Sequence, residues 1–318
     1  MNLAIIAFKN DHPDIFWIKN TFSYYDYDGS TYVELFYISS GTTLETQKEK
    51  FNEALNNFVN NATMYSSEYE REKYVNDYII SNCAYDDEAA YNNNTKGNVS
   101  TAYGVLVDGK AICEGYARAF QLLCNKLGIE CVSIAGMTGD VGHEWNCAKI
   151  DGNWYQVDVT WNDSQDDFSN YYYFNLTDEQ MYSSHRADDL FDEIEPDNYN
   201  NDENLIGNLY VPECNSTEYN YYNQTAPILY AFDEENDNTI SNALANSAVN
   251  GDNYFNIIVD DSLDFEDAYS TLVQDGYVVN YIESANNMLW GEVELDTSSY
   301  AYKNDTLRVI TIVLNYIN

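Results

Sequence analysis

Basic side chains are scarce in this sequence. Its 318 residues contain 14 lysines and arginines against 53 aspartates and glutamates, which gives a net charge of −39. Because phosphate groups are bound by a basic face, this composition argues against nucleic acid as a partner. It argues equally against docking on an anionic membrane surface. The acidity is explained most simply as a solvated surface, and a specific acidic docking site is the less favoured alternative.

Long apolar runs are also missing. No stretch reaches the length that a membrane-spanning helix requires, so we expect no membrane insertion. The first residues, MNLAIIAFKNDHPDIFW, have neither a basic leader nor a small-residue cleavage site and therefore do not predict a signal peptide. Their short apolar patch predicts a first strand, and export stays undecided from this segment.

Cysteine pairs with the spacing of a metal or redox motif are absent. The six cysteines include no CxxC pair, which argues against a zinc knuckle or a redox site. They are too sparse for a disulfide scaffold at this chain length. Cys124, Cys131 and Cys147 lie in apolar contexts, where a free cysteine behaves as a small hydrophobe, and are expected in the core. No function follows from the sequence for Cys83 or Cys214.

Hydrophobic patterning predicts strands first and helices next. Alternation from Leu3 to about Ser40 predicts strands, with a hairpin turn at Asp26–Gly29. Helical spacing follows from Thr42 to about Asn82. The stretch YYYFNL is interpreted as a strand, and PDNYNNDEN, which begins at Pro196, as a linker.

We therefore expect one domain over residues 1–195 and a smaller α/β domain over residues 196–318. In the smaller domain, APILYAF and YFNIIVD predict strands. ISNALANSAV and LDFEDAYSTLVQ predict helices, and Gly276 is the expected stop of the second helix. YVVNYIE, MLWGEVELD and LRVITIVLNYI are interpreted as further strands. This domain suggests no chemistry of its own.

Cys113 lies where a loop gives way to a helix, in GKAICEGYARAF. Apolar residues then recur at the spacing of a buried helix, and Gly128 is a suitable C-terminal stop. In the first turn of a helix, free N–H groups and the positive end of the dipole stabilise a thiolate. Cys113 is therefore a candidate nucleophile, although a lone cysteine is more commonly a buried structural thiol.

A nucleophilic cysteine needs a base, and the chain has only three histidines. Neither His12 nor His185 lies in an element that would direct its side chain. His143 precedes a hairpin whose favoured turn pair is Asp151–Gly152. Residue numbers paired across that turn sum to 303 (150 plus 153), which makes His143 and Asp158 diagonal neighbours on one face. A three-residue loop would instead place them on opposite faces. Asp158 would then orient His143 through one imidazole nitrogen.

These residues carry a resemblance to a known family. The segment AICEGYARAFQLLCNKLGIECVSIAG, followed by GHEWNCAKIDGNWYQVDVTWND, resembles the transglutaminase-like superfamily of cysteine peptidases and acyltransferases, bacterial members included. The resemblance is specific over about residues 101–163 and extends over about residues 45–195. It implies an α+β, papain-like core in which a helix that begins at the cysteine packs on an antiparallel sheet. The smaller C-terminal α/β domain carries no signal of the family.

The resemblance implies amide acyl transfer without a cofactor. His143 would take the proton of Cys113, Asp158 would orient His143, and a thioester on Cys113 would be resolved by water or by an amine. We expect peptide hydrolysis rather than protein cross-linking, because the sequence shows no separate amine-donor site. The backbone N–H of Cys113 would stabilise the oxyanion, and the family pattern suggests Tyr103 as a side-chain donor.

Other interpretations stay open. Trp145 and Trp161 bracket the hairpin and would wall a cleft or serve as ordinary packing. A zinc site on Cys113, His143 and Asp158 would lack a fourth protein ligand, so no metal is expected. A catalytically inactive module that binds peptide or cell-wall material in the same cleft is the alternative to an enzyme. The expected partner is a protein or peptide substrate, for example a cell-wall peptide, and the expected location is extracellular or on the cell surface.

Overall fold

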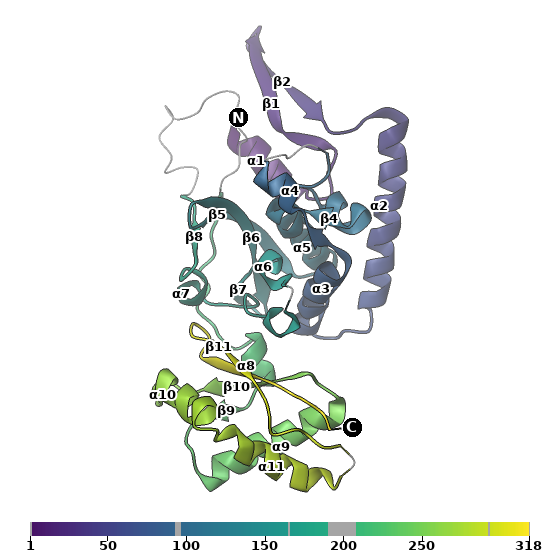
Figure 1. Ribbon diagram of the computed structural model, residues 1–318. Coiled ribbons are helices and arrows are strands. Elements are labelled where there is room, and N and C mark those ends of the chain that lie inside the picture. The colour runs from purple at the N-terminus through teal and green to yellow at the C-terminus, as the bar shows by residue number, and fades with distance from the viewer. Residues whose placement is uncertain (1, 93–96, 165, 190–207, 292, 318) are drawn as a thin grey trace. The chain divides into compact units, whose positions relative to one another are not determined.

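The chain divides into two compact units. The computed structural model describes residues 2–92, 97–164, 166–189, 208–291 and 293–317 (Figure 1). The first unit is Met1–Ser216 and the second is Thr217–Asn318. The boundary predicted after residue 195 and the linker predicted from Pro196 lie outside the described residues. Among the described residues, no helix is both long enough and apolar enough to cross a membrane.

The first unit combines helices with a four-stranded sheet. Its helices are α1 (Asn2–Asp11), α2 (Gly41–Ala62), α3 (Glu68–Asn82), α4 (Asp87–Tyr91), α5 (Cys113–Lys126), α6 (Val159–Asn162) and α7 (Asp178–Met181). Its strands are β1 (Ile18–Tyr27), β2 (Ser30–Tyr37), β3 (Ala84–Tyr85), β4 (Lys110–Ala111), β5 (Glu130–Thr138), β6 (Val141–Ile150), β7 (Asn153–Val157) and β8 (His185–Ala187). The sheet has the order β7-β6-β5-β8, and every pair in it is antiparallel. This confirms the predicted α+β core.

Helix α5 is the central helix of this unit. It packs against β5 and β6 of the sheet and against α3. Ten of its fourteen residues are buried, the polar Glu114 and Gln121 among them, as expected for a helix that is enclosed by its neighbours. Gly128, at φ +81°, supplies the left-handed residue after the helix, and the amide of Ile129 donates to the carbonyl of Cys124 at 2.9 Å. The helix therefore begins and ends where the sequence predicts.

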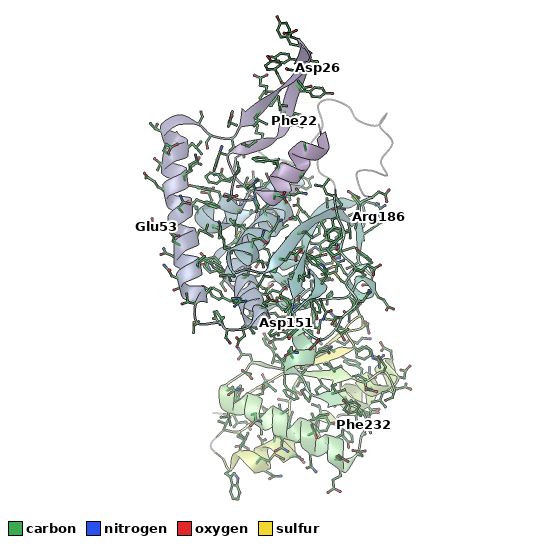
Figure 2. The ribbon with its side chains drawn as sticks, turned by 180° about the vertical axis from the view of Figure 1, so that it is seen from behind. Phe22, Asp26, Glu53, Asp151, Arg186 and Phe232 are labelled. Atoms are coloured by element: carbon green, nitrogen blue, oxygen red, sulfur yellow. The ribbon has the colours of Figure 1, made fainter. Side chains whose placement is uncertain are left out.

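The β6–β7 hairpin has the predicted turn and register. Asp151 and Gly152 have φ values of +47° and +90°, as a two-residue hairpin turn requires. The paired residues run from Ile150–Asn153 to Asn146–Val157, so their numbers sum to 303 as expected. The pairing ends there, however, and Asp158 is the N-cap of helix α6 rather than a strand residue. Figure 2 labels Asp151 at this turn.

The start of the chain departs from the prediction. The apolar patch expected to form a first strand is helix α1, and the first strand, β1, begins only at Ile18. A short continuous apolar run suits a buried helix as well as a strand, so periodicity could not decide. The expected hairpin is present, because β1 pairs antiparallel with β2 around a turn at Asp28–Gly29. Figure 2 shows Asp26 at the tip of this hairpin, which projects from the rest of the unit.

The second unit contains a four-stranded mixed sheet and two main helices. Its helices are α8 (Tyr221–Thr225), α9 (Glu234–Asn250), α10 (Phe265–Tyr269) and α11 (Val278–Leu289). Its strands, in the sheet order β11-β12-β10-β9, are β11 (Ala301–Asn304), β12 (Val309–Val313), β10 (Tyr254–Val259) and β9 (Ile228–Leu229). Only β9 and β10 are parallel. Helices α9 and α11 pack together and contribute to one core with β10 and β12 (Figure 1).

Three predicted strands were wrong. YVVNYIE forms part of helix α11, whose buried residues Val278, Tyr281, Ile282, Ala285 and Leu289 follow helical spacing despite the valines. The described part of MLWGEVELD completes α11 and then contributes only an isolated bridge at Leu295. YYYFNL is a series of turns with a single bridge, from Leu176 to Gln156. The stretch APILYAF is a strand only over β9.

Candidate active site

Cys113 is the first residue of α5, as predicted. Its neighbour Gly115 lies so close to the preceding loop that an added Cβ would sit 2.5 Å from the carbonyl oxygen of Val99. The amide of Ile112 donates to the same carbonyl at 2.9 Å. The loop is thereby held against the first turn of the helix. All six cysteines are free, and Cys113 alone among them is partly exposed rather than buried.

His143 and Asp158 are in direct contact. Nε2 of His143 lies 2.6 Å from Oδ2 of Asp158, and the two side chains are 6% and 0% exposed. Cys113 lies close enough to His143 to raise the pKa of its imidazole. Because Nε2 is engaged by Asp158, Nδ1 is the nitrogen that remains for Cys113. The three residues singled out from the sequence are therefore brought together in the order thiol, imidazole, carboxylate.

His143 and Asp158 shift each other's pKa in the direction that favours the charged form of each. Burial alone would lower the pKa of His143, but the Asp158 carboxylate and, to a smaller extent, Cys113 raise it to about 10. Burial would likewise raise the pKa of Asp158, yet the contacts with His143 and with a second histidine, His185, hold it well below its usual range. The geometry therefore favours a charged imidazolium beside a carboxylate.

Asp158 accepts hydrogen bonds on both carboxylate oxygens. Oδ1 accepts from the backbone amides of Thr160 and Trp161 at 2.9 and 3.1 Å, which is the usual N-cap arrangement at the start of a helix. Oδ2 faces Nε2 of His143 and, at 3.0 Å, Nε2 of His185. The carboxylate is therefore fixed from four directions.

His185 is the site residue that the sequence analysis missed. It was judged to have no supporting element, but it opens the short strand β8, where it pairs with Thr138 of β5. A strand of three residues has no readable period, and its partner is distant in sequence. The sequence offered only one hint of this role, which is that His185 is one of just three histidines in the chain and that the candidate carboxylate, Asp158, needs hydrogen-bond donors.

A tyrosine other than the predicted one lies beside Cys113. Tyr103 is buried, with its ring 4.7 Å from that of Phe16 and 6.1 Å from that of Phe51. Tyr85, at the end of β3, instead lies near Cys113. Burial and the nearby charge of Cys113 raise the pKa of this phenol to about 12. The oxyanion role proposed for Tyr103 stays a prediction, and Tyr85 is a second candidate.

The two tryptophans differ in their surroundings. Trp145 is 1% exposed and donates from Nε1 to Oε1 of Gln156 at 2.7 Å, which fits the packing interpretation. Trp161 is partly exposed, and its ring lies 6.0 Å from that of His143. Trp161 is thus the one of the two that borders the imidazole from a partly open position.

His143, Asp158 and His185 together offer the donor set of a metal site, with ligand atoms within 4.8 Å of one another. The distances of 2.6 and 3.0 Å between the imidazole nitrogens and Oδ2 are those of hydrogen bonds. Ligands at about 2.0–2.1 Å from a tetrahedral zinc ion would lie roughly 3.3 Å apart. The arrangement therefore fits protons between these atoms better than it fits a metal ion.

A cavity of about 370 Å³ lies elsewhere in the first unit. Its lining includes the basic residues Lys9, Lys19 and Arg118, but none of the three candidate residues described above. Arg118 is paired with Glu114 at 3.0 Å, so its charge is compensated. This cavity is not part of the candidate active site.

One segment of the chain matches a known family model. Residues 56–159 match the family model of the transglutaminase-like superfamily. This segment includes α5 and the β6–β7 hairpin. The resemblance inferred from the sequence is thus confirmed over that segment, which is less than half of the chain.

Individual relatives are similar over part of the chain. The kyphoscoliosis peptidase of Mus musculus is 28% identical over 167 residues, which cover 49% of this chain and 24% of the mouse protein. The kyphoscoliosis peptidase of Homo sapiens is 27% identical over 146 residues, which cover 42% of this chain and 22% of the human protein. The match thus spans about a quarter of the length of these curated relatives. A solved structure described as a TGase aligns with a TM-score of 0.32 and 17% identity, over 50% of this chain and 49% of its own.

Proposed function

We propose that the protein is an enzyme that transfers the acyl group of an amide to its own Cys113, with peptide hydrolysis as the main outcome. The observation that carries this proposal is the grouping of Cys113, at the N-terminus of a buried helix, with His143, which is hydrogen-bonded to Asp158. The related proteins are named peptidases, which agrees with hydrolysis, but their sequences match only part of this chain.

The proposed reaction proceeds by proton transfers between Cys113, His143, the substrate and water. His143 takes the proton of the Cys113 thiol on Nδ1, and Asp158 stabilises the resulting imidazolium. The thiolate attacks the amide carbonyl and forms a C–S bond, while the imidazolium protonates the departing amine. Water then attacks the thioester with His143 as its base, and the carboxylic acid leaves as Cys113 is regenerated. The backbone N–H of Cys113 and the hydroxyl of Tyr85 are the candidate donors to the oxyanion.

Water and an amine compete for the same thioester, so protein cross-linking is the second activity to test. The alternative to an enzyme is a module that binds peptide or cell-wall material in the same cleft without reacting. We further propose an extracellular or cell-surface location, on the grounds of the acidic composition.

The deciding experiment is the pH dependence of Cys113 alkylation by iodoacetamide, read by peptide mass spectrometry. The other five cysteines are buried, so the labelled peptide reports mainly on Cys113. We expect rapid labelling well below the ordinary thiol pKa of about 8.5, and loss of this reactivity in His143→Ala. His12→Ala, which changes an exposed histidine, is the matched control. Labelling that is slow below that pH and indifferent to His143 would exclude an activated thiolate and favour the binding module.

With an activated Cys113, two assays on the same glutamine-containing peptide separate the activities. Formation of the free carboxylic acid reports hydrolysis, and incorporation of a fluorescent primary amine reports transfer, whereas ammonia is released from glutamine in both. Cys113→Ala is the blank for both. Incorporation that exceeds hydrolysis at millimolar amine would make cross-linking the main activity.

A further inference from the structure

His185 is a fully buried histidine with both ring nitrogens engaged. Its side chain is 0% exposed, Nε2 lies 3.0 Å from Oδ2 of Asp158, and Nδ1 lies 2.8 Å from Oγ of Ser184. Its ring is enclosed by those of Trp161 at 4.7 Å, Trp145 at 5.1 Å, His143 at 5.5 Å and Tyr173 at 5.6 Å. Such a side chain has no freedom to turn its nitrogens elsewhere.

The hydrogen-bond partners determine which nitrogen carries the proton. An ionised carboxylate only accepts, so Nε2 of His185 must be the donor to Asp158. Nδ1 hydrogen-bonds Oγ of Ser184 at 2.8 Å, and the Ser184 hydroxyl also donates to the carbonyl oxygen of Met181 at 3.4 Å. Burial raises the pKa of the neighbouring Tyr173, and Ser184 acts in the opposite direction. Both ring nitrogens of His185 therefore have a hydrogen-bond partner.

We infer that His185 is a positioning residue, which holds the Asp158 carboxylate in the orientation that Asp158 needs to act on His143. This inference rests on the function proposed above and assigns that site a fourth side chain. The backbone amides of Thr160 and Trp161 anchor Oδ1. His185 anchors Oδ2, the oxygen on which His143 depends. Without His185, this oxygen would be held by His143 alone.

Close packing keeps His185 in place. Strand β8 pairs with β5 at Gly136, where an added Cβ would lie 2.2 Å from the carbonyl oxygen of Arg186 and 2.6 Å from the ring of Trp145. Only a glycine at this position lets β8 and the tryptophan approach so closely. The titratable groups that face His185 are Asp158, His143 and Tyr173.

Three substitutions separate the hydrogen bond from the packing. His185→Gln places an amide donor as many bonds from Cα as Nε2, so the bond to Asp158 can persist. His185→Asn places its donor at the position of Nδ1, so the side chain is too short to reach Asp158. His185→Phe keeps a ring among the aromatic neighbours but removes both polar atoms. His12→Gln is the control for loss of a histidine outside the site.

Two readouts are measured on each folded full-length variant. The first is the rate of Cys113 alkylation by iodoacetamide at pH 6. The second is the pKa of His143 from NMR titration of its ring protons. We expect His185→Phe and His185→Asn to lower the alkylation rate about tenfold, the effect of one pKa unit on the ion pair. The pKa of His143 should fall in both, and His185→Gln should restore both readouts to within about threefold or half a pKa unit of wild type.

Other outcomes overturn the inference. An unchanged rate and an unchanged His143 pKa in His185→Phe would make the residue ordinary packing. A higher His143 pKa in His185→Phe would show that His185 competes with His143 for Asp158 instead of positioning it. Equal losses in the Gln and Phe variants would assign the effect to packing. If His143→Ala leaves wild-type labelling unchanged, the proposed function fails, and the His143 pKa still tests the positioning role separately.

Discussion

The charge of Asp158 is the main reason why His143 should hold a proton, and Asp158→Asn tests this directly. The folded-state pKa of His143 is raised to about 10, although burial opposes its charge. Against the usual value of about 6.5, this rise corresponds to on the order of 5 kcal/mol of interaction. Asparagine keeps the size of the side chain and can still accept the amides that cap α6, but it removes the charge. We therefore expect the pKa of His143 to fall by about three units, toward its usual value, because burial is then opposed only by the smaller contribution of Cys113.

The same shift predicts how stability changes with pH. A histidine whose pKa is raised by folding stabilises the folded state fully below its unfolded pKa, and this contribution is lost as pH rises through the folded pKa. In wild type, the contribution of His143 should therefore decline between about pH 6.5 and pH 10. In Asp158→Asn, the free energy of unfolding should lack this decline and be lower at pH 6.5.

NMR titration of His143 and urea unfolding at pH 6.5, 8 and 10 measure these two quantities. The matched control is Asp233→Asn, which changes the N-cap of α9 in the second unit, where the side chain accepts from the amide of Asn236. A His143 pKa that stays within one unit of wild type in Asp158→Asn would refute the reasoning. So would a decline in stability above pH 6.5 of the same size in both proteins.

Two further predictions concern Tyr85 and the cysteine pair Cys147 and Cys214. Tyr85→Phe should lower the rate of amide hydrolysis about a hundredfold but leave iodoacetamide alkylation of Cys113 unchanged, because alkylation forms no oxyanion. Tyr103→Phe is its control, and equal effects of the two variants on hydrolysis would contradict the assignment to Tyr85. The sulfur atoms of Cys147 and Cys214 lie 3.9 Å apart, so an oxidising buffer should join them in a disulfide that is visible by non-reducing mass spectrometry. Closing this loop should stabilise the protein by about 4 kcal/mol, and two free thiols after oxidation would contradict the geometry.

The parts of the site that could be predicted are those set by neighbouring residues. The start of α5 follows from an apolar stripe that begins just after Cys113 and stops at Gly128. The contact between His143 and Asp158 follows from one turn pair and its register, although the strand pairing ends before Asp158. The reasoning reached the right contact because Asp158, as the N-cap of α6, still lies at the end of the same hairpin.

The parts that could not be predicted depend on contacts between distant segments. His185 reaches Asp158 because a strand of three residues pairs with the far end of β5, and no local pattern announces such a pairing. Tyr85 reaches Cys113 because β3 pairs with β4 just before the helix. The helix α11 was missed for another reason. Its valines favour strands by intrinsic propensity, whereas its packing against α9 favours a helix, and the packing prevails.

Two histidines face the same carboxylate oxygen of Asp158. This arrangement suits a catalytic site better than a structural one. Each donated N–H stabilises the anionic form of Asp158, so the pKa of this carboxyl stays below its usual range despite complete burial. A carboxylate stabilised in this way is a poor proton acceptor, so the proton shared with His143 stays on the imidazole. His143 can then remain an imidazolium beside a thiolate on Cys113, which is the charge separation that the proposed reaction needs. The N–H of His185 adds a second donor to the same oxygen, with its ring 5.5 Å from that of His143, and so it stabilises the anion on which this ion pair depends.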